Sequence, residues 1–244
     1  MNDTLRYQSL DPIYRKFEHN LITFSFMYAF SENFILPISH DEVVHGKCSL
    51  INKMPGEYDQ MFDNFRAYMT YVMMHPGKKL LFMGSEFAQF IEWDYKKELD
   101  WCLLSFEKHR QTHDFVKALN KFYLKNSALF DFDFDDRGFQ WISGEDYQQS
   151  IICFRRKAKD GTELIVVCNF VPVMREHYRI GVPEDGTYKT VFCSDWESFG
   201  GKTEKVRRGV KTNKISMHGQ ENSLELTIPG MSVTVYKKFT RNTK

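Results

Sequence analysis

The sequence contains few cysteines, and they are not arranged as a cysteine-based site requires. Five cysteines are scattered over 244 residues, and no CxxC pair occurs among them. This spacing excludes a zinc ribbon and a redox dithiol, both of which need closely spaced pairs. Reduced thiols in a cytoplasmic protein are the simplest explanation, because disulfides are rare in that compartment. We therefore expect a cytoplasmic protein with free thiols.

Long apolar segments and a strong excess of charge are also missing. No apolar signal-peptide core follows Met1-Asn-Asp-Thr-Leu-Arg, and no stretch is long enough to span a bilayer. The 33 basic residues nearly balance the 32 acidic ones, for a formal net charge of +1. This balance favours neither a nucleic acid nor a membrane as a partner, and it suits an uncharged polymer.

One local cluster of basic residues departs from this balance. It is relieved only by Glu204 and consists of Lys202, Lys205, Arg207, Arg208, Lys211 and Lys214. A phosphate-bearing polymer could bind there, but the aromatic residues that would interleave in such a site are absent. We therefore interpret the cluster as a solvated loop.

The first half of the chain alternates between strand and helix patterns. The apolar run Phe34–Ile38 predicts a buried strand, and Leu80–Met83 predicts a second one. Between them, apolar residues over Tyr58–Val72 recur at helical spacing. The three elements indicate a right-handed βαβ unit whose parallel strands are covered on both faces. Further helices are expected over Asp11–Tyr28, where Asp and Pro suit a helix start, and over Phe115–Tyr123.

The pattern of apolar and polar residues changes near residue 130. From there on it predicts short strands separated by turns. The predicted strands are Ile151–Phe154, Leu164–Cys168, Tyr188–Phe192, Leu224–Ile228 and Val233–Tyr236. Asp160-Gly161 is a hairpin turn signal between the first two of them. Such a succession favours an antiparallel β-sandwich. We expect two domains, residues 1–135 and 136–244, and a fold class of α/β followed by all-β.

The candidate site follows the first predicted strand, where His40-Asp41-Glu42 ends the apolar run. In parallel α/β folds the chemistry lies at the carboxyl ends of strands. Three interpretations stay open from the residues alone. The triplet can be a polar turn, a metal site that also uses His45, or a catalytic carboxylate with His40 as a neighbouring donor. The metal interpretation is the poorest, because a zinc-protease helix needs histidines at i and i+4 with Glu directly after the first.

A longer motif around this site carries a family resemblance. The segment Phe34-Ile-Leu-Pro-Ile-Ser-His-Asp-Glu-Val-Val-His-Gly-Lys47 resembles the last conserved motif of the α-amylase clan, in the form found in 1,4-α-glucan (glycogen) branching enzymes. The likeness covers essentially the whole chain. It continues through His75–Gly84, Glu86-Phe87, Glu92-Trp93, Leu99-Asp-Trp101 and Phe199-Gly-Gly201.

The resemblance implies a fold and a reaction. Members of the family cut α-1,4 linkages in glucans and form α-1,6 branches, with retention of configuration and without a cofactor or metal. Such a reaction needs a nucleophile and an acid/base about 5 Å apart. In the family, Asp41 matches a third carboxylate that stabilises the transition state, and His40 matches a histidine that binds the sugar. Glu42 and Glu86 receive no firm role.

The family motifs that supply the nucleophile and the acid/base have no counterpart here. The resemblance therefore implies the C-terminal part of a (β/α)8 barrel, with its last two strands and their helices, followed by the β-sandwich. Its partners would be an α-glucan and the missing N-terminal part of the same enzyme, and the chain alone would be inactive. Two alternatives are a non-catalytic glucan-binding or structural module and a debranching enzyme of the same clan.

Overall fold

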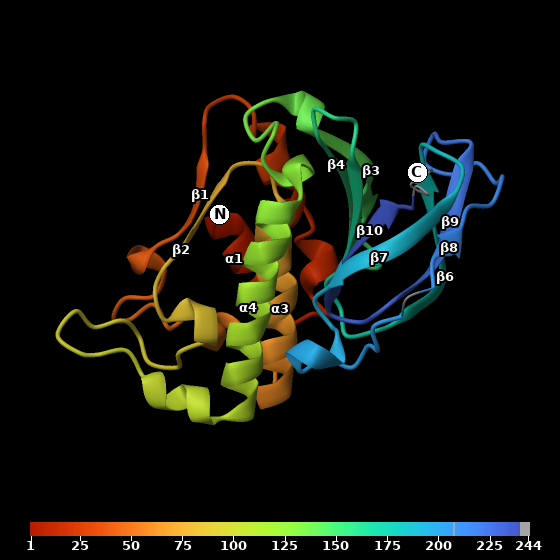
Figure 1. The fold of residues 1–244 in the computed structure, drawn as a ribbon. Helices are drawn as coiled ribbons and strands as arrows, with labels where there is room; N and C mark the ends of the chain where they lie inside the picture. The colour runs from red at the N-terminus through yellow and green to blue at the C-terminus, as the bar shows by residue number, and fades with distance from the viewer. Residues whose placement is uncertain (207, 240–244) are drawn as a thin grey trace.

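A long helix, α3 (Tyr58–Met74), lies at the centre of the molecule between two β-structures of different kinds (Figure 1). The computed structural model describes residues 1–206 and 208–239. One β-structure is a parallel pair of short strands, and the other is a β-sandwich (Figure 1). The other helices are α1 (Asn2–Ser9), α2 (Asn20–Thr23) and α4 (Glu107–Lys125), of which α4 packs along α3. No helix of the described residues is long and apolar enough to cross a membrane.

The boundaries of α3 follow from its end residues. Glu57 and Gln60 form a capping box, in which each side chain satisfies a backbone N–H at the start of the helix. The helix ends at His75, where the backbone becomes extended ahead of Pro76-Gly77. Every residue from Phe62 to Met74 is buried, so the helix is covered on all sides. The helix predicted over this segment is confirmed.

The predicted parallel strands are confirmed, with two differences. β1 (Ile35–Ile38) pairs in parallel with β2 (Lys78–Leu81), which begins and ends two residues before the predicted strand Leu80–Met83. The expectation of two covered faces is wrong for this chain, because Ile35 is 57% exposed and Leu80 40% exposed. The alternating burial of β1 shows that this chain covers one face only.

The single helix expected over Asp11–Tyr28 is also wrong. The Asp11 carboxylate accepts a hydrogen bond from the Ile13 backbone N–H, which makes a turn instead of a helix start. Short 3₁₀ segments and α2 follow, and Ile13 and Phe17 are 67% and 71% exposed. Leu21, Ile22 and Phe26 are buried, but between the exposed Ile13 and Phe17 the buried side chain is Arg15, whose guanidinium donates to backbone carbonyls. A charged residue at the core-facing position is incompatible with the apolar stripe that the spacing suggested.

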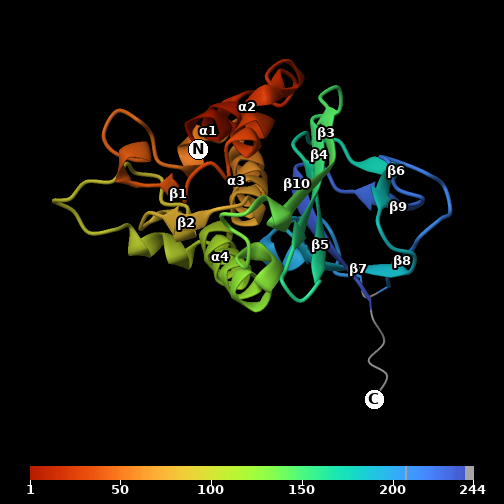
Figure 2. The ribbon, with the colours of Figure 1, turned by 90° about the horizontal axis from the view of Figure 1, so that it is seen from above.

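The β-sandwich predicted for the second half is present. Its larger sheet has six strands in the order β3-β4-β5-β10-β7-β8 (Figures 1 and 2). In a second sheet, β6 pairs with β9. All neighbouring strands in both sheets are antiparallel. The pattern did not single out β3, β6 or β8. The strands are β3 (Phe139–Asp146), β4 (Ile151–Lys157), β5 (Glu163–Asn169), β6 (Arg175–Val182), β7 (Thr187–Cys193), β8 (Val210–Lys211), β9 (Asn222–Ile228) and β10 (Ser232–Lys238).

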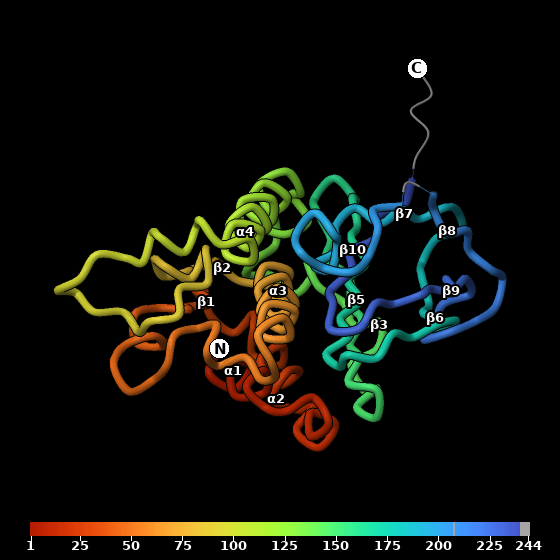
Figure 3. Tube along the Cα trace, turned by 90° about the horizontal axis from the view of Figure 1, so that it is seen from below, coloured from red at the N-terminus to blue at the C-terminus, as the bar shows by residue number. Residues whose placement is uncertain are grey.

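The central strands of the larger sheet are buried on both faces. Ile151 and Ile165 belong to a core shared with β6 and β9, whereas Ile152 and Val166 belong to a core shared with the helices. Neighbouring side chains of a strand point to opposite faces, so one sheet serves two cores. Helix α3 packs against β5 and β10 (Figure 3). The domain boundary at 135/136 stays a prediction, but one hydrophobic core extends across it.

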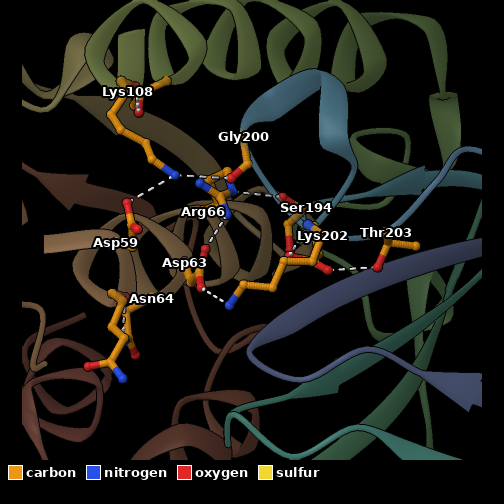
Figure 4. A network of polar contacts seen from close by, with 12 residues as sticks. Asp59, Asp63, Asn64, Arg66, Lys108, Ser194, Gly200, Lys202 and Thr203 are labelled. Carbon is orange, nitrogen blue, oxygen red and sulfur yellow. Dashed lines mark hydrogen bonds and ion pairs between the residues drawn. The ribbon is translucent and has the colours of Figure 1, made fainter. Parts of the chain in front are cut away.

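A polar network ties the loop after β7 to the two long helices (Figure 4). Arg66 of α3 donates to the Ser194 carbonyl at 3.0 Å, and its partner Asp63 also accepts from Lys202 at 3.0 Å. Lys108 of α4 pairs with Asp59 of α3 at 3.1 Å. Gly201 is required in this loop, because a Cβ there would lie 2.2 Å from the Asp195 carbonyl oxygen. The Phe199-Gly-Gly201 motif is therefore explained by close packing.

A second buried ion pair joins Arg156 of β4 to Asp133, and Arg156 also contacts the end of α3. The Arg156 guanidinium donates to the Met74 carbonyl at 2.7 Å and lies 3.4 Å from the Asp133 carboxylate. Both side chains are at most 1% exposed. Lys78, the first residue of β2, pairs with Asp133 at 3.0 Å. Arg156 therefore fixes the point at which the chain leaves α3 and enters the parallel pair.

We expect Arg156→Met to destabilise the chain by about 3 kcal/mol, because it leaves Asp133 with one fewer partner and several carbonyls without a donor. The measurement is urea unfolding followed by circular dichroism. The matched control is Arg137→Met, which removes an exposed pair with Asp135 and should cost much less, because water screens that pair. Equal effects of the two substitutions would contradict the role assigned to Arg156. If Arg156→Met does not fold, Arg156→Lys, which keeps the charge, should fold with an intermediate loss.

Candidate functional site

The His40-Asp41-Glu42 triplet lies where the sequence predicted it, directly after β1. It forms a 3₁₀ turn over His40–Glu42. The loops after β1 and β2 lie at the end of the molecule away from the sandwich (Figure 2). The His40 side chain is 53% exposed and that of Asp41 68% exposed, with His40 Nε2 and Asp41 Oδ1 3.3 Å apart. Both groups are thus presented to solvent beside each other.

Two aromatic side chains from the segment after β2 support the His40 ring. The His40 ring centroid lies 6.1 Å from that of Phe82 and 6.0 Å from that of Trp93. Phe82 and Trp93 pack edge to face at 5.1 Å. The Trp93 backbone N–H also donates to the Val43 carbonyl at 2.8 Å. The position of His40 therefore depends on Phe82 and Trp93, which lie 42 and 53 positions further along the chain.

Glu92 contacts the loop that follows the triplet, residues 44–48. Its carboxylate accepts from the backbone N–H of Cys48 at 2.7 Å and of Gly46 at 3.0 Å, and it lies 3.4 Å from His45 Nδ1. The two backbone hydrogen bonds, with His45 nearby, lower the pKa of the Glu92 carboxyl. In the sequence, Glu92 stands out only as part of the family likeness. Nothing in the local pattern pairs a carboxylate with amides 44 and 46 residues before it.

The other acidic residues of the prediction lie at the same edge of the parallel pair. Glu42 is half-buried on the turn of Asp41, and Glu86 lies in the 3₁₀ turn Ser85–Phe87 that follows β2. Within residues 1–206 and 208–239, no group of three or more His, Cys, Asp or Glu side chains is arranged to hold a metal ion. The site thus consists of carboxylates, imidazoles and aromatic rings.

The basic cluster lies on the sandwich. Lys202 pairs with Asp63, and the Lys205 ammonium lies 4.5 Å from the centroid of the Trp196 ring. These contacts give two of the basic residues a structural role that the interpretation as a solvated loop did not include. Arg207 lies outside the described residues.

The comparisons with known proteins identify a family model for the β-sandwich and relatives for nearly the whole chain. Residues 141–239 match the family model described as the alpha amylase C-terminal all-beta domain. The 1,4-alpha-glucan branching enzyme GlgB of Halothermothrix orenii is 54% identical over 97% of this chain. The corresponding enzymes of Aquifex aeolicus and Clostridium perfringens are 52% and 50% identical over 97% and 100% of it. The chain spans 36% to 38% of the length of these three relatives.

Two solved structures share the fold at low sequence identity. An α-amylase from H. orenii matches with a TM-score of 0.59 at 14% identity, covering 98% of this chain and 47% of that one. An α-amylase from Geobacillus thermoleovorans, complexed with acarbose, matches with a TM-score of 0.53 at 14% identity, covering 85% of this chain and 39% of that one. The arrangement of the parallel strands, helices and sandwich is therefore one that α-amylases also contain.

Proposed function

The chain matches the C-terminal portion of 1,4-α-glucan branching enzymes along its whole length, and we propose that it is that portion of such an enzyme. The enzyme would cut an α-1,4 linkage in a glucan and join the released chain to another through an α-1,6 linkage. The observation that carries the proposal is 50% to 54% identity over at least 97% of the chain. Its partners would be an α-glucan and the N-terminal part of the enzyme.

The first part of the chain would be a piece of a larger barrel. β1 and β2 are parallel and connected through α3, as two neighbouring strands of a (β/α)8 barrel are. They form a sheet of two strands in the described part of the chain, and Ile35 and Leu80 expose apolar surface. A partner that adds strands would pair the free edges and cover these side chains. Residues 1–135 would then be the end of the barrel and residues 136–244 the all-β domain.

Asp41 and His40 would contribute to the reaction at the barrel's catalytic face. A retaining glycosyl transfer needs a carboxylate nucleophile and a carboxylic acid/base on opposite sides of the bond. Asp41 would be a further carboxylate that stabilises the positive charge of the transition state. His40, held by Trp93 and Phe82, would donate a hydrogen bond to the sugar. The nucleophile and the acid/base would come from the missing N-terminal part.

The alternatives have less support. A debranching enzyme of the same clan would be expected to match debranching relatives, whereas the relatives named above are branching enzymes. A non-catalytic glucan-binding module would not need an exposed His-Asp pair whose histidine lies against Phe82 and Trp93. The catalytic hypothesis therefore explains more features of the site than the binding-module hypothesis does.

The test of Asp41 uses a joined enzyme, in which this chain is fused to the N-terminal part of the H. orenii relative that it does not match. Asp41→Asn should lower the branching rate at least about a hundredfold, because one electrostatic contribution to the transition state is lost. Folding should be nearly unchanged, since the side chain is exposed. Branching is measured by iodine staining of amylose and by counting α-1,6 linkages.

The matched control is Asp114→Asn, the same chemical change at an exposed position on α4. This variant should branch amylose at the rate of the unmodified joined enzyme. If Asp41→Asn retains that rate as well, the role assigned to Asp41 is wrong.

We also expect the chain of 244 residues to form no α-1,6 linkages by itself. A single candidate carboxylate cannot act as nucleophile, acid/base and stabiliser at once. The measurement is incubation of the purified chain with amylose, followed by linkage analysis, with the joined enzyme as the positive control. Linkage formation by the chain alone would show that the proposed division of the catalytic groups is incorrect.

A further inference from the structure

We propose that Glu92 is a positioning residue, which holds the 44–48 loop in place beside His40 and Asp41 through its ionised carboxylate. The inference rests on the proposed function for its catalytic consequence, but the positioning itself is a property of this chain. It follows from the backbone of the loop, from the arrangement of hydrogen-bond donors around Glu92 and from the neighbouring contacts of Trp93.

The backbone of the loop is in a conformation that needs support. Gly46 has φ +82° and Cys48 has φ +64°, so both lie in the left-handed region. This region is ordinary for glycine but strained for a residue with a side chain, such as Cys48. A Cβ at Gly46 would meet nothing within 4 Å, so crowding does not dictate the geometry there. Another interaction must therefore hold the loop in this conformation.

Glu92 supplies that interaction. The backbone N–H of Gly46 donates to one carboxylate oxygen, and that of Cys48 to the other. Successive N–H groups of a loop with left-handed residues form a concave site for an anion. A carboxylate whose two oxygens each accept from a different amide is the complementary group. Hydrogen bonds to a charged acceptor are also about twice as strong as neutral ones.

The residue next to Glu92 fixes the other end of the same segment. Trp93 donates its backbone N–H to Val43, pairs with Val44 in a parallel bridge and packs against His40. Glu92 and Trp93 thus contact the chain on both sides of residue 45. The segment after β2 therefore sets the position of the whole stretch that follows Asp41.

The charged groups around Glu92 are few. Among the described residues, His45 is the titratable side chain in contact with its carboxylate, and Lys53 donates to the Lys47 carbonyl on the same loop. The Glu92 side chain is 29% exposed, so water reaches it but does not replace the two amides. The hold on the loop should therefore depend on the charge of Glu92 itself.

The direct test is amide hydrogen exchange of this chain. In Glu92→Gln, one carboxylate oxygen becomes an NH₂ group, which cannot accept from a backbone N–H. The amide that faces the NH₂ group should lose about tenfold in protection factor, as expected for loss of a hydrogen bond to a charged group, and the other amide should lose less, because it keeps a neutral acceptor. Glu98→Gln, the same change at an exposed position further along the segment after β2, is the matched control and should leave both protection factors unchanged. Equal protection in Glu92→Gln and Glu98→Gln overturns the proposal.

A pH series separates this role from general packing. The pKa of Glu92 is lowered in the folded chain, so its contribution is complete above the ordinary carboxyl pKa and is lost as the pH falls through the lowered value. In a His45→Gln background, the protection factors of the two amides should show this step, and the step should vanish when Glu92→Gln is added. Amides of α3 in the same samples report global unfolding. A step that persists without the Glu92 carboxylate contradicts the assignment.

The catalytic consequence is measured in the joined enzyme. Glu92→Gln should lower kcat and kcat/KM by a similar factor of about ten, because a displaced segment after Asp41 weakens interactions made in the transition state. KM should change little. If the unmodified joined enzyme does not branch amylose, the proposed function fails and the exchange results still decide the role of Glu92. If it branches and Glu92→Gln has the same kcat, the catalytic part of the inference fails.

Discussion

Three buried guanidinium groups hold the helical part of this chain on its β-sandwich. Arg15, Arg66 and Arg156 are at most 1% exposed. Each donates across residue 135, Arg15 to the Phe170 carbonyl, Arg66 to the Ser194 carbonyl and Arg156 to the Met74 carbonyl. A guanidinium cannot easily release its proton, and leaving it buried without acceptors is costly. Separation of the two parts would therefore expose an apolar core and also break fixed sets of hydrogen bonds.

This attachment determines where the candidate site lies. Helix α3 carries Arg66 near its middle and offers its last carbonyl to Arg156, so the sandwich holds both its position and its end. β2 starts four residues after that carbonyl, and Lys78 at its start pairs with Asp133, the partner of Arg156. β1 then follows by pairing with β2. The carboxyl ends of both strands are thus placed by the core, while the loops beyond them are held by local polar contacts.

The sequence predicts the elements that have a periodic pattern of apolar residues. It does not predict features that depend on contacts between single residues far apart in the chain. The stripe of α3 and the alternating strands of the sandwich each bury many side chains, so their pattern survives any single exception. The segment after Asp11 has helical spacing too, but Arg15 must reach carbonyls of the core, and that requirement overrides the spacing. The strand before Asp41 was found from its apolar residues. Glu92 and Trp93 stand out only through the family likeness, because their contacts with the stretch after Asp41 are long-range and leave no local pattern in the sequence.

The exposure of Asp41 limits what this chain can do electrostatically. Two unit charges 4 Å apart interact by about 1 kcal/mol in water and by about 4 kcal/mol at the effective dielectric near a protein surface. With 68% of its side chain exposed, Asp41 is closer to the first situation. Stabilising a cationic transition state therefore needs water to be excluded from its surroundings. Asp41 lies three residues beyond the last residue of β1, so a chain segment that paired with the free edges of β1 and β2 would also lie close to Asp41. Under the proposed function, completing the sheet and activating the carboxylate are then consequences of the same association.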